Sequence, residues 1–78
     1  MSSITTLNDL EILKEGIIEK IEAEKRTKNR LLDLGLVPGT KVRSVLSNYF
    51  GTLKAFEFKG TIIALRDVDS GKILVKQK

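Results

Sequence analysis

The alternation of apolar and polar residues along the chain predicts a series of short β-strands. Runs rich in β-branched and other apolar residues recur between polar or glycine-containing breaks, which is the pattern of half-buried strands. Closely spaced strands in a short chain pair antiparallel, and rolling a small sheet into a barrel removes exposed edges. We therefore expect a mainly β fold, a small barrel of about five antiparallel strands, over residues 16–22, 41–46, 53–58, 61–66 and 72–76.

The breaks between these runs have the composition of turns and loops. A Pro-Gly pair at the centre of 37–40 predicts a type II turn, because proline presets φ at the first central position and glycine suits the second. The Lys-Gly pair at 59–60 predicts a tight hairpin. The other connections are expected to be loops at 48–51 and 67–71 and a lead-in at 6–13 with room for one helical turn.

A single short helix is expected between the first and second strands. Thr27 is of the type that caps a helix N-terminus, and Gly35 is typical of the residue that follows a helix. Two to three turns are not stable alone, so this helix must pack on the sheet through one broad apolar side. That side comprises Leu31, Leu32, Leu34 and Leu36, of which we assign the first two to the core.

Length and composition limit the classes of function. The 78 residues suffice for one domain, taken as 1–78, and no apolar run is long enough to span a membrane. With no signal segment visible at the N-terminus, we expect a cytoplasmic protein. The absence of Cys and His excludes disulfides, thiolate metal centres, imidazole ligands and a Ser-His-Asp triad. We expect no enzyme, no cofactor and no metal site, and we interpret Asp67 and Asp69 as turn residues.

The charge distribution leaves two kinds of partner open. The chain has a net charge of +4, made up of −4 over residues 1–24 and +8 over 25–78. The basic cluster 25–30 at the helix start is suited to phosphates or to an acidic protein surface, and equally to a solvated helix end. The segment 35–41 is not a phosphate loop, because three residues separate its glycines and Thr precedes Lys.

Two blocks of the sequence resemble segments of a known protein family. The segment 30–42, Arg-Leu-Leu-Asp-Leu-Gly-Leu-Val-Pro-Gly-Thr-Lys-Val, closely resembles the signature of the FeoA family, the small ferrous iron transport protein A. Residues 59–66 resemble its second block, a glycine followed by an apolar strand ending in Ala-Leu-Arg, and 73–75 resemble its closing strand. The chain departs from the family where many members have a Gly-Asp-Pro turn, here 48–53, and a Glu-Ala pair, here 69–71.

This resemblance implies an SH3-like β-barrel with a short helix inserted after the first strand. It implies a cytoplasmic accessory of ferrous iron uptake that works with the membrane protein FeoB through that protein's cytoplasmic G-domain region, by stimulating its GTPase or aiding its assembly. The same fold occurs as the C-terminal module of iron- or manganese-dependent repressors. Because 78 residues leave no room for a DNA-binding winged helix, we expect a stand-alone FeoA-like protein.

Two hypotheses of function follow. The first is a protein-interaction module that binds FeoB, meets the membrane only through that partner and binds no nucleic acid. The alternative is a small nucleic-acid-binding β-barrel, consistent with the basic charge; aromatic residues would stack on bases in that case, and affinity would fall steeply with salt. The candidate partner-binding residues combine an apolar centre with a charged rim: Arg30, Leu34, Leu36, Lys41, Tyr49 and Phe50.

Overall fold

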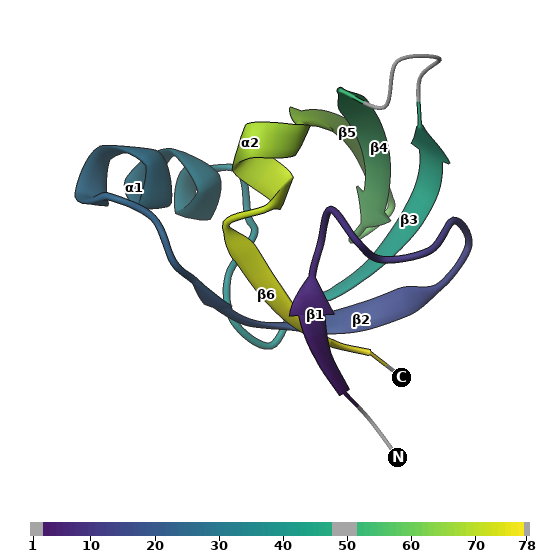
Figure 1. Cartoon of the computed structure of the whole chain (residues 1–78). Coiled ribbons are helices and arrows are strands. Elements are labelled where there is room, and N and C mark those ends of the chain that lie inside the picture. The colour runs from purple at the N-terminus through teal and green to yellow at the C-terminus, as the bar shows by residue number, and fades with distance from the viewer. Residues whose placement is uncertain (1–2, 48–51, 78) are drawn as a thin grey trace.

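The computed structural model describes residues 3–47 and 52–77, which form a curved antiparallel β-sheet with two helices (Figure 1). The candidate residues Tyr49 and Phe50 lie outside the described residues. The elements in chain order are β1 (Ser3–Thr6), β2 (Glu15–Ile21), α1 (Lys25–Asp33), β3 (Lys41–Ser47), β4 (Leu53–Phe58), β5 (Thr61–Arg66), α2 (Asp67–Ser70) and β6 (Ile73–Gln77).

The strands form one sheet in the order β1-β6-β2-β3-β4-β5, with every neighbouring pair antiparallel. The five strands predicted from the sequence are all present, with ends that differ by at most one residue. The sequence analysis missed β1, whose four residues pair with β6 (Ser3 opposite Gln77). A run of four residues is too short to show an alternation of apolar and polar positions. It is a strand because it pairs with β6.

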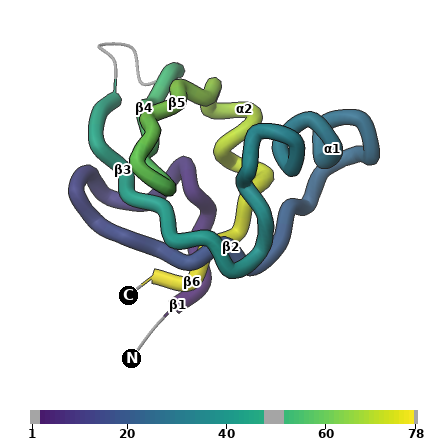
Figure 2. The backbone as a smooth tube through the Cα atoms, turned by 180° about the vertical axis from the view of Figure 1, so that it is seen from behind, coloured from purple at the N-terminus to yellow at the C-terminus, as the bar shows by residue number. Residues whose placement is uncertain are grey.

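The sheet curls around one core (Figures 1 and 2). Its centre is Phe56, fully buried on the inner side of β4, and Phe58 of the same strand is 4% exposed. Among residues 3–47 and 52–77, no strand pairing closes the barrel, because β1 and β5 lie at opposite ends of the strand order. The other buried apolar residues are Leu7, Leu10, Ile18, Ile21, Leu31, Leu36, Val42, Leu65, Ile73 and Val75.

The lead-in before β2 forms turns that fill one side of the core. The amide of Asp9 bonds the carbonyl of Thr6 at 3.1 Å, and that of Leu10 bonds Leu7 at 3.3 Å, so the predicted helical turn is a succession of tight turns. Leu7 and Leu10 are both buried. The Lys54 ammonium donates a hydrogen bond to the carbonyl of Asn8, which ties this segment to β4.

The expectation of a loop over residues 67–71 is wrong in one respect, because the first four of these residues form the short helix α2. Ser70, at the end of α2, is fully buried and its Oγ donates a hydrogen bond to Asn8 Oδ1 at 3.1 Å. The amide of Asn8 in turn donates to the carbonyl of Ser70 at 3.2 Å. This reciprocal pair fixes α2 against the N-terminal segment. Within the described ranges, no helix is long and apolar enough to span a membrane.

Candidate protein-interaction site

The end of α1 and the turn after it carry an exposed surface that we call the helix–turn face, defined by Arg30, Leu34, Val37 and Lys41. All four side chains are exposed, and Leu34 leaves 47% of its surface open to solvent. Figure 2 shows α1 to one side of the barrel, with the chain returning from it to β3. The face therefore combines two aliphatic side chains with two cations.

Helix α1 ends where backbone geometry requires it. Gly35 has φ +101°, a left-handed conformation that glycine adopts without steric cost. Its amide bonds the carbonyl of Leu32 at 2.9 Å, and the amide of Leu36 bonds the carbonyl of Leu31 at 3.2 Å. These two bonds make a Schellman motif, in which the side chains of Leu31 and Leu36 meet across the helix end. The predicted role of Gly35 is confirmed.

The same motif corrects the expectation for Leu36. The sequence analysis placed its side chain among the partner-binding candidates, but Leu36 is fully buried, as is Leu31. Because a Schellman motif turns the second residue after the helix back over its last turn, an apolar residue there packs inward. Leu34, at the helix C-terminus itself, points to solvent instead, so the two leucines have opposite roles.

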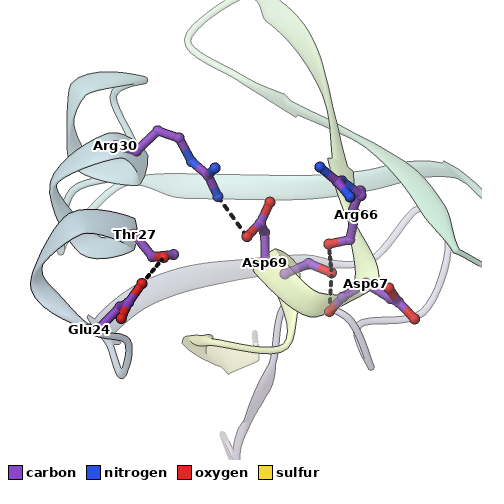
Figure 3. Close-up of polar contacts among 7 residues, drawn as sticks. Glu24, Thr27, Arg30, Arg66, Asp67 and Asp69 are labelled. Carbon is purple, nitrogen blue, oxygen red and sulfur yellow. Dashed lines mark hydrogen bonds and ion pairs between the residues drawn. The ribbon is translucent and has the colours of Figure 1, made fainter.

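The start of α1 also differs from the prediction. The helix begins at Lys25, two residues before Thr27, and Glu24 takes the N-cap position without a side-chain bond to the helix backbone. Thr27 Oγ1 lies inside the first turns and donates to Glu24 Oε1 at 3.4 Å (Figure 3). The first turn carries no acidic residue. The cations at this end oppose the helix dipole, and the Glu24 carboxylate at the N-cap position offsets them in part.

An ion pair joins the two helices. Arg30 Nη2 donates to Asp69 Oδ1 at 2.7 Å, and Figure 3 shows the two side chains reaching toward one another from α1 and α2. The Asp69 side chain is 18% exposed and that of Arg30 is 56% exposed. The interpretation of Asp69 as a turn residue did not include this contact between the two helices. The sequence offered no signal for this pair, because 39 positions separate the two residues.

A cleft of about 380 Å³ lies between the helices, beside this ion pair. Val68 projects at its α2 side and is 61% exposed. The other lining residues are polar or small: Ala23, Glu24, Thr27, Asp69 and Lys72. The cleft is open and mixed in character, so its chemistry suits contact with another protein surface better than capture of a small molecule.

The remaining candidate residue, Lys41, opens β3. It is exposed and lines a second open hollow of about 190 Å³ with Glu15, Arg43, Glu57, Phe58, Lys59 and Gly60. Acidic side chains do not gather in groups of three that could hold a metal ion within residues 3–47 and 52–77. Arg30, Leu34 and Lys41 are therefore exposed, the first two at the end of α1 and the third at the start of β3, whereas Leu36 is buried.

Comparison with known protein families shows to which family this chain belongs. The family model of the FeoA domain matches residues 5–77. The chain belongs to the FeoA family. The resemblance identified in the signature segment is therefore confirmed over nearly the whole length. A search of curated proteins found no match.

Solved structures of FeoA proteins have the same fold. The NMR structure of a FeoA-like protein from Clostridium acetobutylicum matches with a TM-score of 0.88 and 26% sequence identity, covering 99% of this chain and 90% of that one. The crystal structure of Stenotrophomonas maltophilia FeoA complexed with zinc matches with a TM-score of 0.79 and 27% identity, covering 91% and 88%. The latter is described as a prokaryotic SH3-domain protein. The predicted SH3-like barrel is confirmed.

The FeoA fold also forms part of longer proteins. A manganese-dependent transcriptional repressor matches with a TM-score of 0.88 and 13% identity, covering 100% of this chain and 44% of that chain. At this identity the likeness shows the fold alone. The expectation that the fold recurs as a module of metal-dependent repressors is confirmed.

Proposed function

We propose that this protein is a non-enzymatic regulator of ferrous iron uptake that binds the cytoplasmic G-domain region of a FeoB-type transporter. In this account it acts in the cytoplasm, reaches the membrane only through that partner, and modulates the partner's GTPase activity or assembly. Membership of the FeoA family supports the role in ferrous iron transport. So does the description of the Stenotrophomonas maltophilia relative as a candidate activating factor of that transport.

The observation that best supports binding of a partner protein is the exposure of the Leu34 side chain to solvent. Leu34 leaves 47% of its surface in water at the end of a helix, three residues before the exposed Val37. Covering this apolar surface with a partner protein would make binding more favourable. Arg30 and Lys41 add two exposed cations, of which Arg30 also pairs with Asp69 of α2. An apolar centre within a polar rim is the usual arrangement of a protein–protein interface.

The proposal assigns no chemistry to the chain itself. The sequence has no His and no Cys to act as base, nucleophile or soft-metal ligand. Hydrolysis of GTP would take place wholly in the partner's site. The nucleic-acid alternative gains no support from the described aromatic residues, because Phe56 and Phe58 are buried and offer no face on which a base could stack.

A pair of variants tests the helix–turn face. Leu34→Asp places a charge at the apolar centre, and Ile12→Asp places one at a loop residue of similar exposure, 44% against 47%, before β2. Titration calorimetry with the isolated G-domain region should show binding weakened about tenfold or more by Leu34→Asp, since burying a carboxylate in an interface is costly. Ile12→Asp should bind as the wild type does. Equal affinity of all three proteins would overturn the proposed face.

A further inference from the structure

Strand β5 has a hydrogen-bonded neighbour on one side only. β4 pairs with it along its full length, from Leu53 opposite Arg66 to Phe58 opposite Thr61, without a register shift. In the strand order, β5 is the last strand, and no described strand pairs with its other side. Among the described strands, the outer edge of β5 is therefore one of the two open edges of the sheet, and β1 forms the other.

The hairpin turn determines which backbone groups face that edge. Lys59 and Gly60 have φ of 52° and 77°, the two positive values of a type I′ turn. In such a two-residue hairpin the residues flanking the turn exchange both N–H···O bonds, and every second pair does the same. The residues of β5 that bond β4 are thus Thr61, Ile63 and Leu65.

The N–H and C=O groups of Ile62 and Ala64 consequently point away from β4. In the described part of the chain, no hydrogen bond to another segment reaches these groups. Ile62 is 61% exposed, and Ala64 is exposed too. Two donors and two acceptors in strand geometry are therefore accessible along one edge.

Apart from Arg66 at its end, strand β5 lacks the features with which proteins discourage strand addition. Such features are prolines, charged residues and bulges within the edge strand. Residues 61–65 read Thr-Ile-Ile-Ala-Leu, with none of these, and cations stand only at the two ends of the segment. Lys59 in the turn and Arg66 at the end of β5 are both exposed.

Two carboxylates lie near the edge: Asp67, half-buried at the start of α2 directly after Arg66, and Glu57, which belongs to the sheet. Glu57 on β4 is directly opposite Ile62, and on its other side it is directly opposite Arg43 of β3. Cross-strand neighbours of opposite charge attract one another. The exposed charged residues of the edge itself are thus Lys59 and Arg66, one at each end, with Ile62 and Ala64 between them.

We propose that the outer edge of β5 binds an extended segment of a partner protein, which adds to the sheet as a further strand and has an apolar centre flanked by carboxylates. Backbone bonds to Ile62 and Ala64 supply the attachment, and Lys59 and Arg66 select the acidic flanks. A second copy of this chain fits poorly, because it carries the same edge cations and the same net charge of +4. The edge shares no residue with the helix–turn face, so this proposal and the proposed function are tested separately.

The probe is the peptide acetyl-Asp-Glu-Val-Thr-Val-Thr-Glu-Asp-amide, added to the full isotope-labelled chain. Amide hydrogen exchange, followed by NMR, should slow about tenfold at Ile62 and Ala64 when free peptide is about ten times its Kd. Thr61, Ile63 and Leu65 should keep their exchange rates, because their amides already bond β4. Absence of this alternation at about 1 mM peptide would overturn the proposal.

Ala64→Pro tests the backbone contact. It removes an outward N–H without removing a β4–β5 bond, and prolines are tolerated at such edge positions. Binding of the peptide should be lost, whereas the matched control Ala64→Ser, which keeps the N–H, should bind as the wild type does. Retained binding by a folded Ala64→Pro variant would contradict the proposal.

A charge-reversed variant gives a test that does not depend on the proline variant folding. Lys59→Glu combined with Arg66→Glu should abolish binding of the acidic peptide and create binding of the same peptide with Lys in place of Asp and Glu. Equal binding of both peptides to the wild type would refute the charge selection. Protection of Ile62 and Ala64 that rises with protein concentration, without peptide, would assign the edge to a second copy and refute the partner chemistry.

Discussion

Arg30 on α1 donates a 2.7 Å hydrogen bond to the carboxylate of Asp69 on α2, and this ion pair joins the two helices across 39 positions of sequence. Helix α1 stands at the side of the barrel (Figure 1), while α2 is fixed to the N-terminal segment through Ser70. The pair thus connects the helix–turn face to the body of the protein.

Asp69→Asn should lower the free energy of unfolding only slightly. Because Arg30 is 56% exposed, water screens the pair, and its loss should cost under ~1 kcal/mol. Urea denaturation of Asp69→Asn, Arg30→Met and the double variant measures the coupling between them. Glu22→Gln is the control, since Glu22 pairs with Lys20 at the surface, where both side chains are more than half exposed. A coupling near zero would show that the ion pair does not stabilise the fold.

Leu36→Ala and Leu34→Ala should differ strongly in stability. Leu36 is fully buried in the Schellman motif, so its truncation should cost ~2–5 kcal/mol. Leu34 is half exposed, and its truncation should change the free energy of unfolding by no more than ~0.5 kcal/mol. Chemical denaturation of the two variants makes the comparison. Equal losses would contradict the opposite orientations of these leucines.

Gly35→Ala should destabilise the protein more than Gly39→Ala. Both glycines have positive φ, +101° and +94°, so each substitution strains the backbone by ~1–2 kcal/mol. A Cβ at Gly35 would also lie 3.2 Å from Phe58 Cε2, whereas a Cβ at Gly39 meets nothing within 4 Å. The difference between the two midpoints in thermal unfolding therefore isolates the contact with Phe58. A larger loss at Gly39 would refute this assignment.

Ser44→Ala should leave stability unchanged or raise it by up to ~1 kcal/mol. Ser44 is fully buried on β3, and its Oγ has no hydrogen-bond partner in the structure as described, so the hydroxyl is desolvated without compensation. Ser70→Ala is the matched comparison. Its Oγ donates to Asn8 Oδ1, and removing it should cost ~1–2 kcal/mol. Urea denaturation that ranks the two in the reverse order would contradict this prediction.

Local sequence signals predicted most of the barrel. Alternation located β2 to β6, and the turn over 37–40 is confirmed by Gly39 with φ +94° and by the bond from the Thr40 amide to the Val37 carbonyl at 3.1 Å. Such features depend on neighbours in sequence. The strand β1 and the helix α2 depend on distant partners, β6 and Asn8, and local patterns do not encode these.

The candidate site was predictable only in part. Its place at the helix end follows from the signature segment, but spacing alone does not distinguish Leu34 from Leu36. The bond from the Leu36 amide to the Leu31 carbonyl makes that distinction, because it turns Leu36 inward. The binding role of the exposed residues stays a prediction, as do those of Tyr49 and Phe50, outside the described residues.

The most direct test of the central claim is an amide-resolved NMR titration of the labelled protein with the cytoplasmic G-domain region of its FeoB-type partner, with single-stranded RNA as control. The account predicts saturable shifts with the G-domain region around Arg30, Leu34 and Lys41, and none with RNA. Absence of shifts with the G-domain region, together with salt-sensitive shifts with RNA, would contradict it and favour a nucleic-acid-binding barrel.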